Sequence, residues 1–265
     1  MSFFSDPISL LWRHRHMLLQ TTRNDIRARY AGSTLGMAWT ALFPLIFLGV
    51  YAVVTLVIAR MKPAGMSGLD YMGLVFCGLM PFIGFTEALV VGTSSVTSNA
   101  SLIKNTLFPI ELIPVKAVLT SQCTQVVGTC ILLLTLAAMQ SLSVWAFLLP
   151  VVWLTQIFFT IGVVWILSSL NVYFRDLQNI IALVPLILQV ISPIAWSAEM
   201  IPERMRKFMG INPLYYLITA YQDCLKYGRF PHDHALAIMA ILAALFFLCG
   251  YWFFTRMKLV FADNV

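Results

Sequence analysis

The sequence predicts an all-α integral membrane protein with about six transmembrane helices, and two observations support this prediction. Of the 265 residues, 60% are hydrophobic and only 11% are charged, whereas a soluble domain carries about 25% charged residues. The apolar residues also gather in runs of about 20, the length that crosses the hydrocarbon layer of a membrane. So few charges cannot cover a surface that faces water, and the chain length leaves no room for a large soluble domain.

Six apolar runs follow the first 36 residues. The fourth run contains no charge, and the fifth is short and broken by Pro185 and Pro193. Six crossings would place both termini on one side, and we divide the chain into an N-terminal segment, 1–36, and a transmembrane domain, 37–265. The six runs are 37–59, 71–95, 115–139, 145–170, 180–196 and 235–254.

The segment 6–30 has the pattern of an amphipathic helix at a membrane surface. Asp6 and Pro7 form a helix start signal, because an aspartate caps the helix and a proline suits its first position. Apolar residues recur at helical spacing and arginines supply a basic face, as in helices that bind an anionic leaflet. The alternative is a basic flank with no further role. The residues that we expect to form this interface helix include Trp12, Arg23, Arg27, Arg29 and Tyr30.

The basic residues predict cytoplasmic termini. With this orientation the cytoplasmic side holds ten of the 17 Lys and Arg residues, five of them in the N-terminal segment. Cytoplasmic loops carry the excess of positive charge in membrane proteins. The net charge of +6 therefore follows from membrane topology and does not indicate nucleic-acid binding.

The outer segment of about 197–234 contains an apolar stretch, 214–220, that is too short to cross a membrane. Backbone at membrane depth is tolerated where it is packed in protein or lines a wet cavity. We therefore predict two short re-entrant helices here, and the alternative is a folded outer cap with a small core of its own. The residues that we assign to this segment are Pro202, Asn212, Pro213, Tyr215 and Tyr216.

No catalytic or metal motif is visible in the sequence. The chain lacks G-x-x-x-x-G-K-[ST] and H-E-x-x-H, and none of the five cysteines forms a C-x-x-C pair. His232 and His234 are better explained as a solvated loop than as a metal site. We expect a chain that is not an enzyme and that binds no metal or cofactor.

Two features suggest a passage through the transmembrane domain. Trp39, Phe43, Phe47 and Tyr51 recur every four residues, a spacing that suits either helix packing or the lining of a channel for sugar rings. Glu87 is an acid inside a predicted span, which is costly and often functional, although it can also hydrogen-bond within the bundle. The residues that we predict to line a channel are Trp39, Phe43, Phe47, Tyr51, Glu87 and Trp196.

The order of short motifs along the chain resembles the permease subunits of ABC-2 type polysaccharide exporters, which export O-antigen, capsule or teichoic acid. Each motif is weak alone, but together they cover almost the whole chain in the expected order. The first two lie between the second and third runs, as N-A-x-L-I-K and F-P-x-E-x-x-P. The matching positions are Asn99, Ala100, Leu102, Ile103 and Lys104, then Phe108, Pro109, Glu111 and Pro114, with further matches at 27–36, 171–176, 192–193, 201–204 and 212–213.

This resemblance implies an ABC-2 (type V exporter) fold in the bacterial inner membrane. It implies a homodimer with a passage between two six-helix subunits, and two copies of a separate cytoplasmic ATPase that bind ATP and Mg²⁺. Asn99, Leu102, Ile103 and Lys104 would form the coupling helix on that ATPase, with the N-terminal helix as a second contact. A lipid-linked polysaccharide would be the substrate, its anionic head meeting Arg27, Arg29 or other basic residues at the cytoplasmic entrance.

Three other functions remain open on the sequence. An ABC-2 permease for a drug or lipid would share the topology and the ATPase. An ion-coupled transporter would usually show more intramembrane charge or an internal repeat. A membrane glycosyltransferase or a scaffold is the last alternative, but no cluster of carboxylates supports catalysis.

Overall fold

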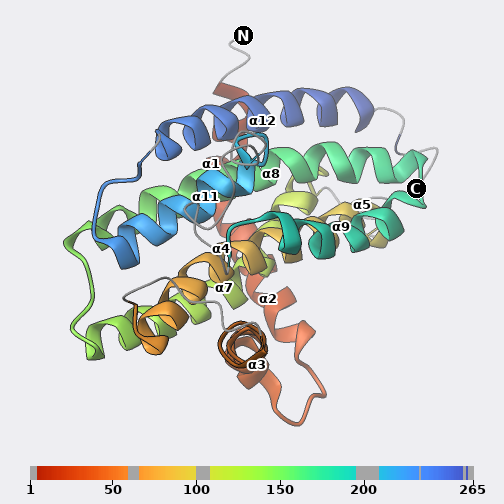
Figure 1. The fold of residues 1–265 in the computed structure, drawn as a ribbon. Coiled ribbons are helices and arrows are strands. Elements are labelled where there is room, and N and C mark those ends of the chain that lie inside the picture. Colours follow the sequence, from red (N-terminus) through yellow and green to blue (C-terminus); the bar gives the residue numbers. More distant parts are fainter. Residues whose placement is uncertain are drawn as a thin grey trace.

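The structure is a computed structural model that describes residues 5–58, 66–99, 108–194, 209–232, 234–258 and 261. Helices account for the regular secondary structure of these residues, and none of them lies in a strand. Figure 1 shows the helices as a bundle in which α12 and α3 occupy opposite edges. The predicted all-α class is confirmed for this part of the chain.

Two short helices form the N-terminal part, α1 (Ser5–Arg13) and α2 (Arg15–Arg29). The single helix predicted for 6–30 is interrupted at His14, whose Nδ1 lies 3.0 Å from the carbonyl oxygen of Leu10. Leu18 is buried against the bundle, whereas Trp12 is 69% exposed. An exposed apolar side is what a helix at a membrane surface requires.

Five helical segments are long and apolar enough to cross a membrane by length and composition. They correspond to the first four predicted runs and to the last one, with ends that differ by a few residues. The first begins with a 3₁₀ turn, Gly36–Ala38, and ends in a π-helical turn, Val53–Ile58. The helices are α3 (Trp39–Ala52), α4 (Gly68–Thr93), α7 (Leu112–Ala138), α8 (Leu149–Tyr173, after a 3₁₀ turn at Val144–Leu148) and α12 (Ala235–Met257).

The fifth predicted run differs from its prediction. Helix α9 (Leu177–Ile191) passes through Pro185 without a break and ends at Ser192, which is extended before Pro193. The predicted break at Pro185 is therefore wrong; helices of membrane proteins tolerate an internal proline when the freed backbone groups find other partners. Fifteen residues span about 22 Å, less than the roughly 30 Å hydrocarbon layer. Helix α9 alone is thus too short to cross.

A short buried helix, α11 (Pro213–Gln222), follows and continues as a π-helical turn, Asp223–Tyr227. Asn212 caps it by accepting a hydrogen bond from the backbone N–H of Leu214 at 3.0 Å. Helix α11 packs against α4, α12 and α8. Its ends are tied to the end of α9: Asn212 donates to Ser192 Oγ at 3.1 Å, and Gln222 donates to the Pro193 carbonyl at 3.1 Å. Residues 197–208 of the predicted re-entrant segment lie outside the described residues, and the re-entrant course of the segment stays a prediction.

Ion pairs show which helix ends lie together. Lys116 near the start of α7 pairs with Asp25 of α2 at 2.9 Å, and Lys258 after α12 pairs with Glu111. At the opposite end Lys226 pairs with Asp70 at 2.6 Å. The chain between α8 and α12 must therefore cross from the end of the bundle near α2 to the end near Lys226. Helices α9 and α11 each cover part of this distance.

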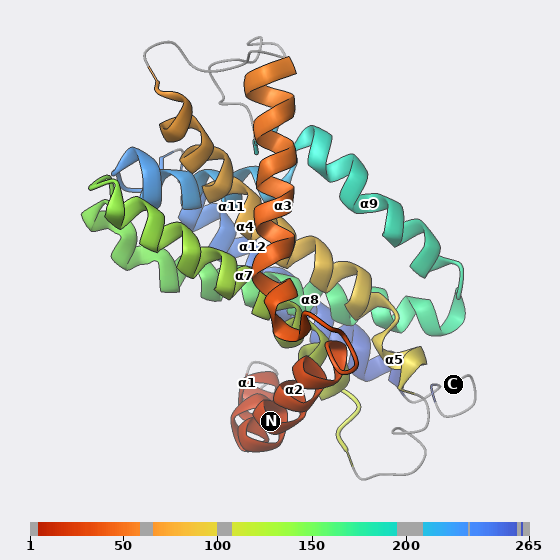
Figure 2. The same cartoon turned by 90° about the horizontal axis from the view of Figure 1, so that it is seen from below.

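Helix α4 is the centre of the bundle and α3 lies at its edge. Of the most apolar window of each helix, 83% is buried in α4 but only 11% in the segment that contains α3. Figure 2 shows α3 standing in front of α4 and α7, with α9 to its right. Helices α3 and α9 both contact α4. The side of α4 that lies between them faces the space between these two helices.

A polar network lies inside this apolar bundle. Gln125 and Gln156 exchange two hydrogen bonds of 2.8 Å, and the Tyr221 hydroxyl donates to Gln156 Oε1 at 3.0 Å. Gly84 makes room for it, since a Cβ there would lie 1.7 Å from the Gln125 side chain. Each amide of the network is satisfied, as groups away from water must be.

Candidate functional site

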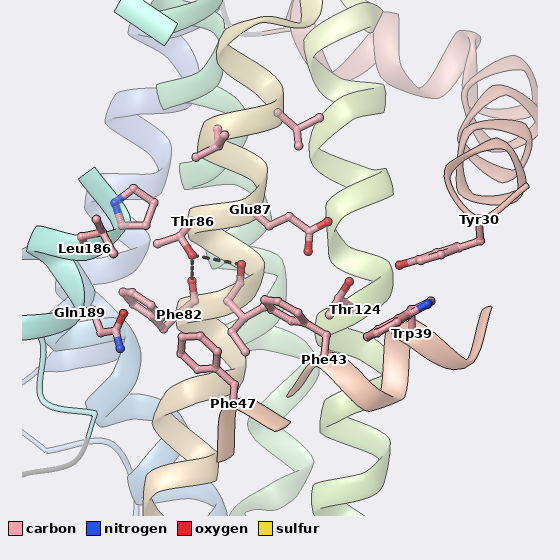
Figure 3. Close-up of a pocket in the computed structure, with 14 residues that line it drawn as sticks. Tyr30, Trp39, Phe43, Phe47, Phe82, Thr86, Glu87, Thr124, Leu186 and Gln189 are labelled. Carbon is pink, nitrogen blue, oxygen red and sulfur yellow. Dashed lines mark hydrogen bonds between the residues drawn. The ribbon is translucent and has the colours of Figure 1, made fainter. Parts of the chain in front are cut away.

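A cavity of about 500 Å³ lies between α3, α4, α7 and α9. The rings of α3 form one wall and the side chains of α9 form the other, with α4 between them (Figure 3). Apart from Glu87, the lining is apolar, aromatic or uncharged polar. The lining residues are Tyr30, Trp39, Phe43, Phe47, Phe82, Ile83, Thr86, Glu87, Val90, Val91, Thr124, Pro185, Leu186 and Gln189.

The aromatic stripe of α3 both packs on itself and lines this cavity. The ring centroids of Phe43 and Phe47 are 5.8 Å apart, and those of Phe47 and Tyr51 are 5.9 Å apart. Trp39, Phe43 and Phe47 line the cavity, whereas Tyr51 lies one turn beyond the lining residues, and the lining of a channel by these residues stays a prediction. Trp196, also predicted to line a channel, is outside the described residues. The rings of α3 therefore contact one another along the helix and also border the cavity.

Glu87 projects from α4 into the cavity on the side of Tyr30 and Thr124 (Figure 3). Its carboxylate pairs with the Arg29 guanidinium at the end of α2, and the two side chains are 23% and 26% exposed. A carboxylate within a membrane span is expected to require such a partner. The pair joins the N-terminal helix directly to the cavity wall. This contact is not visible in the sequence, because 58 residues separate the two groups.

A second, polar cavity of about 250 Å³ lies between α2, the α4–α5 junction and α7. Helix α5 (Ser95–Ser98) is a single turn, and Asn99 ends it by donating to the Ser95 carbonyl at 2.8 Å. Arg29 and Lys116 are the cations in its lining, and Asp25 is the carboxylate. Of the predicted coupling residues, Asn99 lines this cavity, and Leu102, Ile103 and Lys104 lie outside the described residues.

The other predicted residues lie apart from both cavities. Trp12 is exposed on α1 with the Arg15 guanidinium 4.6 Å from its ring, and Arg23 and Arg27 are exposed on α2. Asn212 and Pro213 start α11, where the Tyr215 and Tyr216 rings meet edge to face at 5.3 Å. Pro202 is outside the described residues.

His232 and His234 do not form a metal site in the described part of the chain. His232 pairs instead with the buried carboxylate of Asp223, which Arg229 also binds at 2.7 Å. No group of three or more His, Cys, Asp or Glu residues in that part is placed to hold a metal ion.

A comparison with protein families assigns the chain. The sequence profile of the family described as "ABC-2 type transporter" matches residues 17–225, from α2 to the turn after α11. The chain belongs to the ABC-2 type transporter family. The resemblance drawn from the motifs is thereby confirmed at the level of the family.

Curated relatives of this ABC-2 chain match along almost its whole length. The O-antigen export system permease protein RfbA of Myxococcus xanthus is 27% identical over 258 residues, which are 96% of this chain and 97% of the relative. The protein of the same name from Klebsiella pneumoniae is 27% identical over 251 residues, covering 93% and 94% of the two chains. Both relatives are named as permease proteins of export systems. With the family match and the long apolar helices, this makes the ABC-2 chain a transport subunit and a multi-pass membrane protein.

Proposed function

We propose that this ABC-2 chain is the permease subunit of an ATP-driven exporter of a lipid-linked polysaccharide of the O-antigen type. The observation that carries the proposal is the wall of Trp39, Phe43 and Phe47 on a helix that the bundle leaves largely uncovered. Aromatic faces bind the apolar faces of sugar rings, and the hydroxyls and amides of Thr86, Thr124 and Gln189 suit sugar hydroxyls. The names of the relatives support the same substrate class.

The uncovered wall supports the predicted homodimer. One chain presents one aromatic wall beside α9, and a second copy of α3 and α9 would complete a passage around a glycan. The sixth crossing, made by α9 and the re-entrant segment, gives this passage its outer end. The membrane is the bacterial inner membrane, with both termini in the cytoplasm.

ATP and Mg²⁺ would be bound by a separate cytoplasmic ATPase, in two copies. Asn99, the first residue of the predicted coupling segment 99–104, lies at the α2 end of the bundle, where such a partner would contact the chain. Movement of that segment would reach α4 directly, because α5 follows α4 after one residue. The Arg29–Glu87 pair supplies a second route, from the N-terminal helix to the cavity wall.

The test is depletion of the ABC-2 chain in its host, followed by glycan staining and electron microscopy. Loss of surface polysaccharide with polymer accumulating in the cytoplasm is the expected result. An unchanged surface coat without internal polymer would overturn the glycan assignment and favour export of a small molecule or lipid.

A further inference from the structure

The last turn of α8 contains Asn171, the first residue of the matched motif 171–176. Its side chain is buried, and it bonds to two other elements at once. The Nδ2 atom donates to Thr97 Oγ1 of α5 at 3.3 Å, and the Oδ1 atom accepts from the backbone N–H of Gln178 in α9 at 3.1 Å. Figure 2 shows α5 close to the turn between α8 and α9. One side chain of α8 thus joins α5 to the first turn of α9.

The bond to Gln178 supplies a cap that α9 does not provide for itself. The first N–H groups of a helix have no partner within the helix. The side chain of Asp176, the residue before α9, makes no capping hydrogen bond in the described part of the chain. Asn171 contributes the acceptor from the neighbouring helix instead, and a neutral amide suits this place because it can accept at one atom and donate at the other.

Helix α9 depends on such bonds at its ends for its position. It packs on α4 and α8, but Ile181 is the only one of its residues that is buried among the described residues. At the far end Ser192 accepts from Asn212, and the carbonyl of Pro193 accepts from Gln222. An element with few buried contacts moves more readily than the core. The bonds at the two ends of α9 therefore decide where this helix lies.

The other partner, Thr97, lies in the single turn of α5, two residues before Asn99 of the predicted coupling segment. Its hydroxyl donates to the Ser94 carbonyl at 3.0 Å, so its oxygen is left to accept from Asn171. A displacement of α5 therefore changes the position of the Asn171 amide, and with it the start of α9. The same helix carries Leu186 of the aromatic cavity.

We propose that Asn171 is a positioning residue that couples movement of α5 to α9, the wall of the aromatic cavity opposite α3. The inference rests on the proposed function, in which an ATPase acts on the segment that follows α5. It adds the residue that carries this action to the second wall, since the two routes described above end at α4. Asn171 and Thr97 are not among the described residues that line the aromatic cavity, so they act on a substrate through α9.

The test measures thiol labelling of Leu186→Cys in the full chain, purified with its ATPase, with and without the non-hydrolysable ATP analogue AMP-PNP and Mg²⁺. Leu186 is 63% exposed, and peptide-resolved mass spectrometry separates the new thiol from the native cysteines. We expect the analogue to change the labelling rate by about fivefold or more, as coupling between two sites usually does. Thr97→Val keeps the shape of the side chain but removes the acceptor, and it should abolish this change. Thr97→Ser keeps the hydroxyl and should preserve it.

Thr93→Val is the matched control, because Thr93 is also buried but its hydroxyl bonds to Leu89 of its own helix at 2.7 Å. Its loss leaves the Asn171 bonds intact, and the response to AMP-PNP should persist. Asn171→Leu removes both bonds of the amide. Adding Thr97→Val to Asn171→Leu should have no further effect, since the two substitutions break one link. Thermal unfolding of each complex measures stability separately.

A response that survives Thr97→Val would overturn the proposal. So would the absence of a response in the chain that carries Leu186→Cys alone, since α9 would then not follow the ATPase. Loss of the response in Thr93→Val would show a general effect of removing buried hydroxyls and would also overturn it. A response that falls only in step with thermal stability would make Asn171 a merely structural residue.

This labelling assay contains no glycan, so its failure is separate from that of the proposed function. A response that survives Thr97→Val, combined with internal polymer on depletion, would remove the Asn171 link and leave polysaccharide export intact. A response that Thr97→Val abolishes, combined with an unchanged surface coat on depletion, would keep the link and remove the glycan.

Discussion

Gly162 of α8 and Gly250 of α12 face one another so closely that a Cβ on Gly250 would lie 2.2 Å from the carbonyl oxygen of Gly162. Small residues allow such close contact between helices in membranes, where packing replaces the hydrophobic effect as the main attraction. No flexible side chain is present at this point to move aside, because the atoms in contact belong to the backbone.

Gly250→Ala should therefore force α8 and α12 apart and destabilise the protein by about 1–3 kcal/mol, the usual effect of overpacking. The measurement is thermal unfolding in detergent, followed by size-exclusion chromatography. Gly73→Ala is the matched control, because its Cβ would lie at an ordinary 3.6 Å from Leu136. Equal melting of the two variants would contradict the predicted contact.

The buried network of Gln125, Gln156 and Tyr221 should act as a unit. Tyr221→Phe and Gln125→Leu each remove part of it, and we expect their effects on stability to be coupled by about 0.6–2 kcal/mol. A double-mutant cycle on thermal stability measures this coupling. Tyr221→Phe combined with Thr135→Val should be additive, since the exposed Thr135 hydroxyl bonds to its own helix. Additive effects in both cycles would show that Gln125, Gln156 and Tyr221 do not stabilise the protein as a unit.

The two partners of the Asp223–Arg229 ion pair differ in burial, so substitutions at the two positions should differ in their cost to stability. Asp223 is fully buried, whereas the Arg229 side chain is 51% exposed. Arg229→Gln removes a cation from a buried carboxylate, which costs more than Asp223→Asn, where the remaining cation reaches water. Thermal unfolding should therefore rank Arg229→Gln below Asp223→Asn, and the reverse order would contradict the burial of Asp223.

The aromatic wall can be tested with a matched pair of tryptophans. Trp39 on α3 is 40% exposed and Trp252 on α12 is 45% exposed, but only Trp39 lines the cavity. If export uses this wall, Trp39→Ala should lower surface polysaccharide severalfold at equal membrane abundance, and Trp252→Ala should not. Equal export by both variants would show that the α3 wall does not line the export passage.

The coupling assignment predicts variants that insert but do not export. Replacing Leu102 or Lys104 should impair surface polysaccharide while the protein reaches the membrane in normal amounts, because only the ATPase contact is lost. Immunoblots of membrane fractions measure the amount of protein in the membrane, and a glycan stain measures surface polysaccharide. Normal export by these variants would refute the assignment.

The long helices were predictable because run length alone decides which segments can cross a membrane. The run 235–254 and helix α12 agree at one end and differ by three residues at the other. Pro185 was misread because its effect depends on the neighbours that satisfy the freed backbone groups, which a single sequence does not display.

The candidate site was predictable only in part. The four-residue spacing placed Trp39, Phe43 and Phe47 on one face, but it could not say what lay opposite them. Glu87 was visible as a lone acid, yet its partner is 58 residues away and depends on how α2 docks on α4. Lone intramembrane charges give a usable signal: each one requires a counter-charge somewhere in the fold.

Asp25 and Arg29 lie one turn apart on α2, but their partners, Lys116 and Glu87, lie on two different later helices. The N-terminal helix is synthesised first and cannot complete these contacts until Lys116 has been added, 91 residues after Asp25. At about 5–20 residues per second, this delay is roughly 5–20 s. Until then α2 cannot make both ion pairs, so the complete set of these contacts requires α4 and α7, the second and third spans, to be in place. An ATPase that recognises the docked helix would thereby bind only to chains whose N-terminal half is already folded.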